Sequence, residues 1–192
     1  MHTDALIVGF DLDGVVIDHT QNKITIAARY GVHLRPEDTP TETLEHILSP
    51  EIHQALREQL YDDTDEALSA PLMEGAFNGL ASLREHHIPY FLISRRKKPI
   101  HALHLIERRG LWGDYFTPEN TFFVEAMKDK DIVAKRLGVT HYIDDETRVL
   151  ELMPSVPHRF VFDSRSSSAQ KGVYPCLHNW GEVGQVLGIA NL

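Results

Sequence analysis

Residues 5–16 read Ala-Leu-Ile-Val-Gly-Phe-Asp-Leu-Asp-Gly-Val-Val, a short apolar run that leads into two aspartates. In an extended chain, residues i and i+2 point to the same side, so the carboxylates of Asp11 and Asp13 leave the end of a strand together. Gly14 allows the sharp exit of the chain that must follow. Because two anions this close repel each other, the pair implies a bound cation, a shared proton or both.

The bulk composition narrows the class of protein. The chain has 192 residues and a net charge of −9, which fits one domain with an insertion and argues against a general nucleic-acid binder. The single cysteine, Cys176, excludes an internal disulfide and fits a reducing compartment. No apolar run has the length of a membrane span, and residues 1–11 lack the basic start of a signal peptide. We therefore expect a cytoplasmic protein whose partners include neither a membrane nor a nucleic acid.

Short apolar segments alternate with helical ones along most of the chain. The apolar residues of each segment are continuous, as expected for a parallel sheet that is covered on both faces. The expected strands are 5–10, 89–93, 120–124, 141–143 and 159–162. The expected helices are 76–86, 99–109 and 129–137, the last of which is expected to bury Ile132, Val133 and Leu137. This alternation predicts an α/β protein with a doubly wound parallel sheet, a Rossmann-like core.

One stretch breaks this alternation. About 60 residues separate the first two expected strands, far more than one crossover needs. Helical periodicity is present over 21–30, 41–48 and 51–61. It predicts a small α-helical cap formed by residues 17–73, with a core formed by residues 1–16 and 74–192. Because the insertion begins just after the aspartate pair, we expect it over the carboxyl ends of the strands, where ligands bind in open α/β sheets.

Polar residues at other strand ends and at one helix start complete the set. Ser94 follows the second expected strand, Lys130 lies in the first turn of helix 129–137, and Asp144-Asp145 follow the fourth strand. This set, in this order, resembles the haloacid dehalogenase-like (HAD) hydrolase superfamily over nearly the whole chain. The matching motifs are Asp11-Leu-Asp13-Gly14-Val15, Leu92-Ile93-Ser94, Lys130 and Ile143-Asp144-Asp145.

The resemblance implies a role for each of these residues. Asp11 would be the nucleophile that forms an aspartyl-phosphate, and Asp13 would protonate the leaving oxygen and then activate water. Ser94 would donate to a phosphate oxygen, and Lys130 would neutralise the nucleophile and the phosphate together. Mg²⁺ would be held by Asp11, the backbone carbonyl of Asp13 and Asp144. The branches of the superfamily that process phosphate keep the second aspartate, so Asp13 points away from carbon–halogen chemistry.

The sequence leaves alternatives for two of these assignments. Lys128 is a rival to Lys130 as the motif lysine, and Lys130 is preferred because its spacing to the fourth strand resembles that of the superfamily. Asp145 is expected to orient the site without binding the metal directly. The opposite assignment, in which Asp145 binds the metal in place of Asp144, stays open.

A basic run at 95–98 follows the second expected strand and precedes a helix N-terminus, which itself favours anions. We expect one of its residues, with Arg95 as the candidate, to help hold an anionic substrate. The whole set predicts a magnesium-dependent phosphatase that acts on a small phosphorylated metabolite, either a nucleotide or a sugar phosphate. A phosphomutase of the same superfamily and a non-catalytic binding protein on the same scaffold are the alternatives. The sequence does not determine the oligomeric state.

Overall fold

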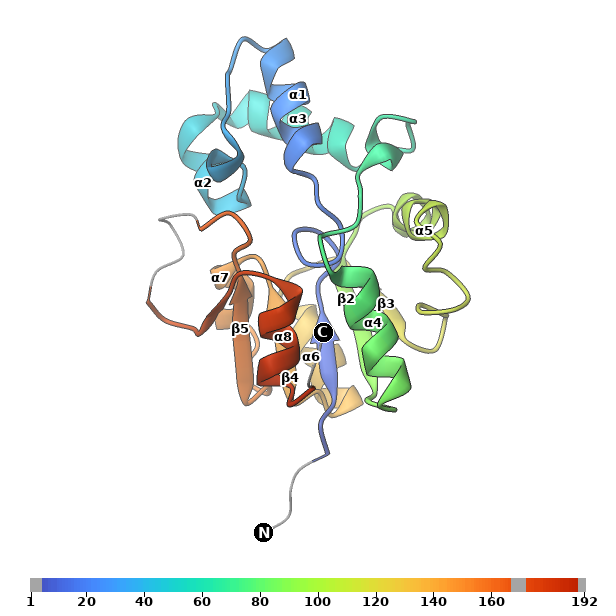
Figure 1. The fold of residues 1–192 in the computed structure, drawn as a ribbon. Coiled ribbons are helices and arrows are strands. Elements are labelled where there is room, and N and C mark those ends of the chain that lie inside the picture. Colours follow the sequence, from blue (N-terminus) through green and yellow to red (C-terminus); the bar gives the residue numbers. More distant parts are fainter. Residues whose placement is uncertain (1–4, 167–171, 190–192) are drawn as a thin grey trace.

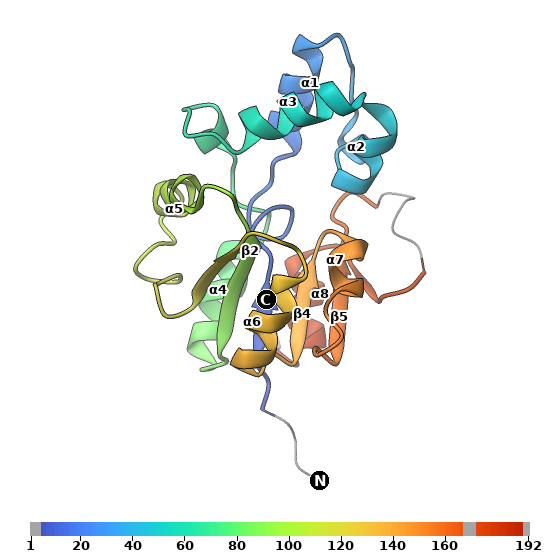
Figure 2. The ribbon, with the colours of Figure 1, turned by 180° about the vertical axis from the view of Figure 1, so that it is seen from behind.

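Within the residues that the computed structural model describes, 5–166 and 172–189, six parallel strands form one sheet in the order β3-β2-β1-β4-β5-β6 (Figures 1 and 2). The strands are β1 (Val8–Phe10), β2 (Tyr90–Arg95), β3 (Thr121–Val124), β4 (His141–Asp144), β5 (His158–Phe162) and β6 (Cys176–Leu177). β1 lies inside the sheet and pairs with β2 on one side and β4 on the other. The predicted doubly wound parallel sheet is confirmed.

Helices cover both faces of this sheet. α4 (Ala76–Glu85) and α8 (Trp180–Val186) lie on the face that is in front in Figure 1. α6 (Asp129–Leu137) and α7 (Thr147–Glu151) lie on the face that is in front in Figure 2, and α5 (Pro99–Arg108) lies beside the β2–β3 side in both views. One apolar cluster joins the sheet to α4, α5 and α8, and a second joins it to α6 and α7.

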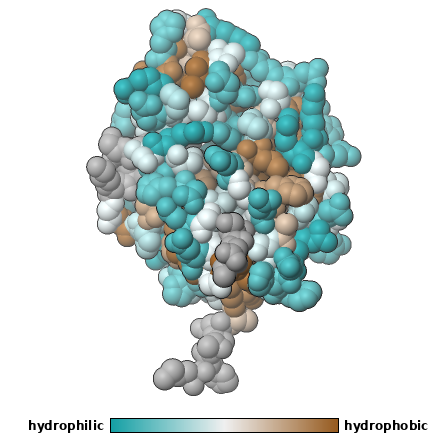
Figure 3. All heavy atoms as spheres, viewed as in Figure 1, coloured by the Kyte–Doolittle hydropathy of each residue, from teal (hydrophilic) through white to brown (hydrophobic). Residues whose placement is uncertain are grey.

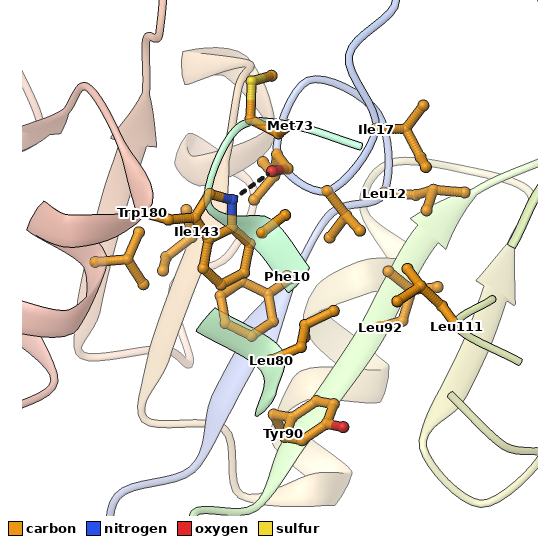
Figure 4. Close-up of a cluster of buried hydrophobic side chains, with 14 of the residues drawn as sticks. Phe10, Leu12, Ile17, Met73, Leu80, Tyr90, Leu92, Leu111, Ile143 and Trp180 are labelled. Carbon is orange, nitrogen blue, oxygen red and sulfur yellow. Dashed lines mark hydrogen bonds between the residues drawn. The ribbon is translucent and has the colours of Figure 1, made fainter. Parts of the chain in front are cut away.

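The indole of Trp180 ties α8 to the segment that carries the aspartate pair (Figure 4). Its Nε1 donates a hydrogen bond to the carbonyl of Val15 at 2.9 Å, and its ring lies 5.1 Å from the ring of Phe10. The side chain is buried and covers Gly79 of α4, where an added Cβ would collide with the ring. Because the polar tip of the indole has a partner, burying this large side chain leaves no hydrogen bond unmade. The contact holds α4, α8 and the chain after β1 in one arrangement.

A second group of helices lies between β1 and α4 in the sequence and above the carboxyl ends of the strands in space (Figures 1 and 2). It contains α1 (Thr20–Arg29), α2 (Thr41–Ile47), α3 (Pro50–Leu60) and two 3-10 turns, Pro36–Asp38 and Ala67–Ser69. α3 begins where expected because the hydroxyl of Ser49 accepts from the N–H of Ile52 and Pro50 occupies the first helical position. These helices share an apolar cluster of their own, built around Ile26, Leu44 and Leu56.

The sequence pattern does not predict β6, α7 or α8, which have only two, five and seven residues. The predicted burial of Ile132 is wrong, because this side chain is 66 % exposed. Helix α6 turns Lys130 and Ala134 toward the sheet instead, with Val133 and Leu137 partly buried beside them. A charged residue thus occupies a buried position of this helix, which pattern reasoning gives to apolar residues.

On the face shown in Figure 3, hydrophilic residues predominate and apolar residues form small patches. Large exposed apolar side chains such as Phe77 and Ile100 come from different helices. In the part of the chain that the structure describes, no helix has the length and apolar character needed to cross a membrane.

We expect Gly79→Ala to destabilise the fold, because the new methyl group has to displace the buried Trp180 ring. Overpacking of this kind lowers the free energy of unfolding by about 1–3 kcal/mol, although alanine favours a helix over glycine by about 1 kcal/mol. Asn78→Ala is the matched control, since Asn78 is the exposed neighbour on the same helix. Urea unfolding followed by circular dichroism measures both, and equal stability of the two variants would contradict the packing role of Gly79.

Candidate active site

β1 and β4 are neighbours in the sheet, but the chain continues from β1 to β2 on one side and from β4 to β5 on the other side. In sheets of this strand order, ligands bind in the crevice outside these strand ends. Asp11 directly follows β1 and Asp144 is the last residue of β4, and the N–H of Asp11 donates to the carbonyl of Ile143 at 3.0 Å. A cavity of about 830 Å³ opens at this point, and residues of the sheet's loops and of helices α1–α3 line it.

Lys130 is buried between two of the aspartates. Its Nζ lies 2.8 Å from Oδ1 of Asp11 and 2.7 Å from Oδ2 of Asp144. Burial alone would lower the pKa of this lysine, but the two carboxylates overcome that effect and hold the pKa well above its usual value. The side chain is therefore a fixed ammonium at neutral pH. Lys128, the other lysine that the sequence offers, is exposed.

Three carboxylates lie close together here, and two of them contact the Lys130 ammonium. Asp11, Asp144 and Asp145 each place an oxygen within 4.8 Å of the others. Burial raises the pKa of Asp144 to about 7, although Lys130 opposes the shift, and burial also holds the pKa of Asp145 well above its usual value. Gly14 has a φ of +78°, and a Cβ there would collide with the Asp145 carboxylate, so the glycine is required for this approach.

These carboxylates fit a divalent cation. An all-oxygen donor set with carboxylates is the chemistry that Mg²⁺ prefers in proteins. Burial, and after it the neighbouring carboxylates, raise the pKa values of Asp144 and Asp145, and a cation bound among these oxygens would oppose both effects. Asp145 belongs to the group alongside Asp144.

The carboxylate of Asp13 has different partners. Its Oδ1 accepts from Nη2 of Arg96 at 2.5 Å and lies 2.7 Å from Nε2 of His19. Burial would raise the pKa of Asp13, but Arg96 and His19 overcome it and hold the pKa well below its usual range. Burial in turn lowers the pKa of His19 against the pull of Asp13. The guanidinium of Arg96 also lies over the ring of Tyr61, 4.0 Å from its centre, which links Asp13 to the end of helix α3.

Ser94 carries a buried polar group without a partner. Its side chain is buried, and its hydroxyl makes no hydrogen bond to any residue that the structure describes. The Nε of Arg96 is in the same situation. An unpaired buried donor costs about 1–3 kcal/mol, and a bound ligand explains such a group in a native structure. Both residues line the cavity beside Asp11, so the two donors fit an anion such as phosphate.

The structure brings the residues singled out in the sequence to one end of the sheet. They are Asp11, Asp13, Ser94, Arg95, Lys130 and Asp144. Sequence reasoning missed His19, because a turn rather than a regular spacing returns the chain to Asp13, with the N–H of Gly14 bonded to the carbonyl of Ile17. It also chose Arg95 from the basic run, whereas the neighbouring Arg96 makes the buried ion pair. The sequence signal that could have identified Arg96 is its position two residues after Ser94, within the basic run 95–98.

The sequence pattern of one protein family matches this chain over residues 5–192. The family is described as 5′ nucleotidase, deoxy (pyrimidine), cytosolic type C protein. The match spans the sheet, its covering helices and the helices α1–α3. A comparison with curated proteins gave no match.

Solved structures of HAD-like proteins resemble the fold over its whole length. A HAD family hydrolase from Deinococcus radiodurans, solved with bound phosphate and sodium, is 15 % identical, with a TM-score of 0.63 over 96 % of each chain. A HAD-superfamily hydrolase from Ehrlichia chaffeensis is 14 % identical, with a TM-score of 0.62 over 98 % of each chain. A putative β-phosphoglucomutase from Thermotoga maritima is 16 % identical, with a TM-score of 0.58 over 95 % of this chain and 98 % of that one. These similarities show a shared fold.

Replacing Lys130 by Met should destabilise the protein strongly, because it leaves Asp11 and Asp144 buried without their cation. Breaking a buried ion pair lowers the free energy of unfolding by about 3–5 kcal/mol. Loss of the ammonium raises the folded-state pKa of Asp144 further above that of the unfolded chain, so the destabilisation grows as pH rises and shrinks as the carboxylate takes up a proton. Urea unfolding near pH 8 and again near pH 5.5 measures this difference.

Lys128→Met is the matched control. It removes the same charge from an exposed position two residues away, and surface substitutions of this kind usually change stability by less than about 0.5 kcal/mol. Equal effects of the two substitutions, or a Lys130→Met effect that does not depend on pH, would contradict the buried ion-pair network.

Proposed function

We propose that this chain, which belongs to the 5′ nucleotidase, deoxy (pyrimidine), cytosolic type C family of HAD-like hydrolases, cleaves a nucleoside 5′-monophosphate with the help of Mg²⁺. Family membership makes the chain a phosphoric monoester hydrolase, as the sequence motifs predict. The cavity of about 830 Å³ has the size of sites that hold nucleotide-sized ligands, and a sugar phosphate is the smaller alternative. A cytoplasmic location belongs to the same proposal and is supported by the lone cysteine.

The contact between Lys130 and Asp11 carries this proposal. One oxygen of Asp11 accepts from the Lys130 ammonium at 2.8 Å, in a cavity that Ser94 also lines. In the proposed first step, Asp11 attacks the phosphorus, the bond from phosphorus to the ester oxygen breaks, and an aspartyl-phosphate forms. Lys130 supplies fixed positive charge where negative charge develops, and such electrostatic stabilisation usually contributes most to this kind of catalysis.

The phosphate's own oxygens have donors in the same place. The hydroxyl of Ser94 has no partner among the described residues and is proposed to donate to one of them. Arg95 also lines the cavity and is proposed to neutralise part of the substrate's charge. These groups are fixed by strand β2 and by the chain directly after it, so they need little rearrangement when a substrate enters.

Asp13 is proposed to move the protons. Its ion pair with Arg96 keeps the carboxylate ionised in this arrangement, which suits it to take a proton from the water that attacks the aspartyl-phosphate. To protonate the leaving oxygen in the first step, the same carboxyl group has to gain a proton. Displacement of Arg96 from Asp13 by the substrate's negative charge is proposed to raise the pKa of Asp13 at that moment.

Asp11, the backbone carbonyl of Asp13 and Asp144 are the proposed ligands of Mg²⁺, and Asp145 is an additional carboxylate in the same group. When bound, the ion would neutralise charge on the phosphate and on the carboxylates around it. We also propose that residues 17–73 act as a cap. Their helices lie over the strand ends and share the lining of the cavity with them, so they are placed to exclude water during transfer.

Phosphate release from a panel of nucleoside 5′-monophosphates and sugar phosphates tests this proposal. We expect the highest kcat/KM for a nucleoside 5′-monophosphate, loss of turnover in excess chelator, and recovery with Mg²⁺. Ca²⁺ should restore turnover poorly, because its larger and looser coordination changes the approach of the nucleophile. Full turnover in excess chelator would contradict the metal requirement, and formation of an isomer without free phosphate would indicate a phosphomutase.

Asp11→Asn should lower kcat by about 10⁴-fold or more for every ester, as expected when a nucleophile is removed. Asp114→Asn is the control, because Asp114 is an exposed aspartate that does not line the cavity. Circular dichroism and gel filtration of both variants establish that the fold is intact before the rates are compared. Comparable activity of the two variants would refute the role of Asp11.

A further inference from the structure

We propose that Asp163, Cys176 and His178 form a binding site for Zn²⁺ or a similar borderline-soft divalent cation at the edge of the sheet. The three side chains come from the ends of β5 and β6, which are neighbours in the sheet. Their ligand atoms, a carboxylate oxygen, Sγ and a ring nitrogen, all lie within 4.8 Å of one another. The inference does not depend on the proposed function, because none of these residues has a part in it.

The pairing of the two strands places the three side chains on one face of the sheet. Val161 of β5 is aligned with Cys176 of β6. The ladder continues past this pair, because the N–H of Asp163 donates to the carbonyl of Leu177 at 2.8 Å. Aligned residues of parallel strands point to the same side, and so do residues two positions apart in one strand. Asp163 and His178 therefore share the face of Cys176.

The packing agrees with this alternation and leaves the group open on one side. Phe162 and Leu177 belong to the apolar cluster under α4, α5 and α8, whereas Cys176 packs against the cluster under α6 and α7. Asp163 is buried, Cys176 is half-buried and His178 is exposed. A cation can therefore reach the carboxylate and the thiol from the side of the imidazole.

Hydrogen bonds orient His178 as a metal ligand would need. Its Nδ1 lies 2.9 Å from the backbone carbonyl of Asp163, and because a carbonyl only accepts, Nδ1 carries the proton. The free lone pair of the neutral ring is then on Nε2. Histidines that bind metals almost always donate their other ring N–H to a carbonyl, a carboxylate or water, which fixes the tautomer and the ring. The backbone N–H of His178 also donates to Oε2 of Glu182 at 2.8 Å, which ties this residue to α8.

The donor atoms select the class of cation. A thiolate and an imidazole favour Zn²⁺ and related transition metals, whereas Mg²⁺ and Ca²⁺ prefer oxygen alone. Three protein ligands leave the fourth position of a tetrahedral ion to water. The three aspartates of the candidate active site offer only oxygens. We therefore expect the two groups to take different ions.

A cation at this place would fasten the short edge strand β6 to β5. β6 has only two residues, and the chain runs from it through Asn179, which caps α8, to the buried Trp180. The ligands come from both strands, so the complete set exists only when the strands are paired. Binding of the cation is thereby coupled to the stability of this edge of the fold.

Cobalt(II) binding tests the site, because the chain has a single cysteine. Co²⁺ replaces Zn²⁺ in tetrahedral sites, and a thiolate ligand gives it a charge-transfer absorption band in the near ultraviolet. We expect Co²⁺ to produce this band in the reduced wild-type protein in excess Mg²⁺, and Zn²⁺ to abolish it. Only Cys176 can give the band, so Co²⁺ bound at the candidate active site does not contribute.

Cys176→Ser should abolish the band. Asp163→Asn and His178→Ala should each raise the Kd for Co²⁺, read from the band, by more than the about 10–100-fold that loss of an outer-shell partner costs. His178 is exposed, so its variant keeps the test valid if Asp163→Asn does not fold. His33→Ala is the matched control and should leave the Kd unchanged, because His33 is an exposed histidine outside the group.

Thermal unfolding tests the structural role of the cation. In excess Mg²⁺, Zn²⁺ should raise the Tm of the wild type and of His33→Ala more than that of Cys176→Ser, because a ligand that binds the folded state stabilises it. The inference would be overturned by the absence of the band at saturating Co²⁺, or by a band whose Kd is unchanged in both Asp163→Asn and His178→Ala. An equal effect of Zn²⁺ on the Tm of the wild type and of Cys176→Ser would overturn the structural role.

Discussion

The buried contact of Lys130 with Asp11 and Asp144 is the constraint around which the rest of the site is arranged. It joins the ends of β1 and β4 to the first turn of α6, so three elements that are distant in sequence have to meet at one point. Replacing a buried ion pair by apolar residues is often neutral or stabilising, so stability alone does not explain such a network. The role proposed for Lys130, a fixed ammonium where phosphate charge develops, explains it.

Several features of the surrounding fold serve to accommodate this network. Gly9 leaves room for the ring of Tyr142 against β1, and the hydroxyl of Tyr142 donates to the carbonyl of Ile93 at 2.6 Å. The Lys130 ammonium lies 5.7 Å from the centre of the same ring, so the tyrosine forms the floor under the charged group. On the other side, Gly14 lets Asp145 approach the chain after β1. Glycine at these two positions thus lets the Tyr142 ring and the Asp145 carboxylate pack closely against the chain.

The part of the site that follows from strand ends was predictable from the sequence. Asp11, Ser94 and Asp144 each come at the end of an apolar run, and parallel strands bring such ends to one edge of the sheet. The partners of Asp13 were not predictable, because His19 reaches it through an irregular turn and Arg96 through the packing of its guanidinium against Tyr61. Periodicity also failed at Ile132, since α6 buries Lys130, and pattern reasoning assigns buried positions to apolar residues.

The central claim is that Asp11 is the nucleophile, and covalent trapping measures it most directly. With p-nitrophenyl phosphate, whose leaving group needs no proton, the Asp13→Asn variant should form the aspartyl-phosphate and hydrolyse it slowly, because it lacks the group that activates water. After reaction with this ester and acid quench, mass spectrometry should find one added phosphoryl group on the peptide that contains Asp11, and hydroxylamine should remove it. Phosphate release by the wild type with no phosphoryl group on that peptide in the variant, or with the group on another residue, would contradict the account.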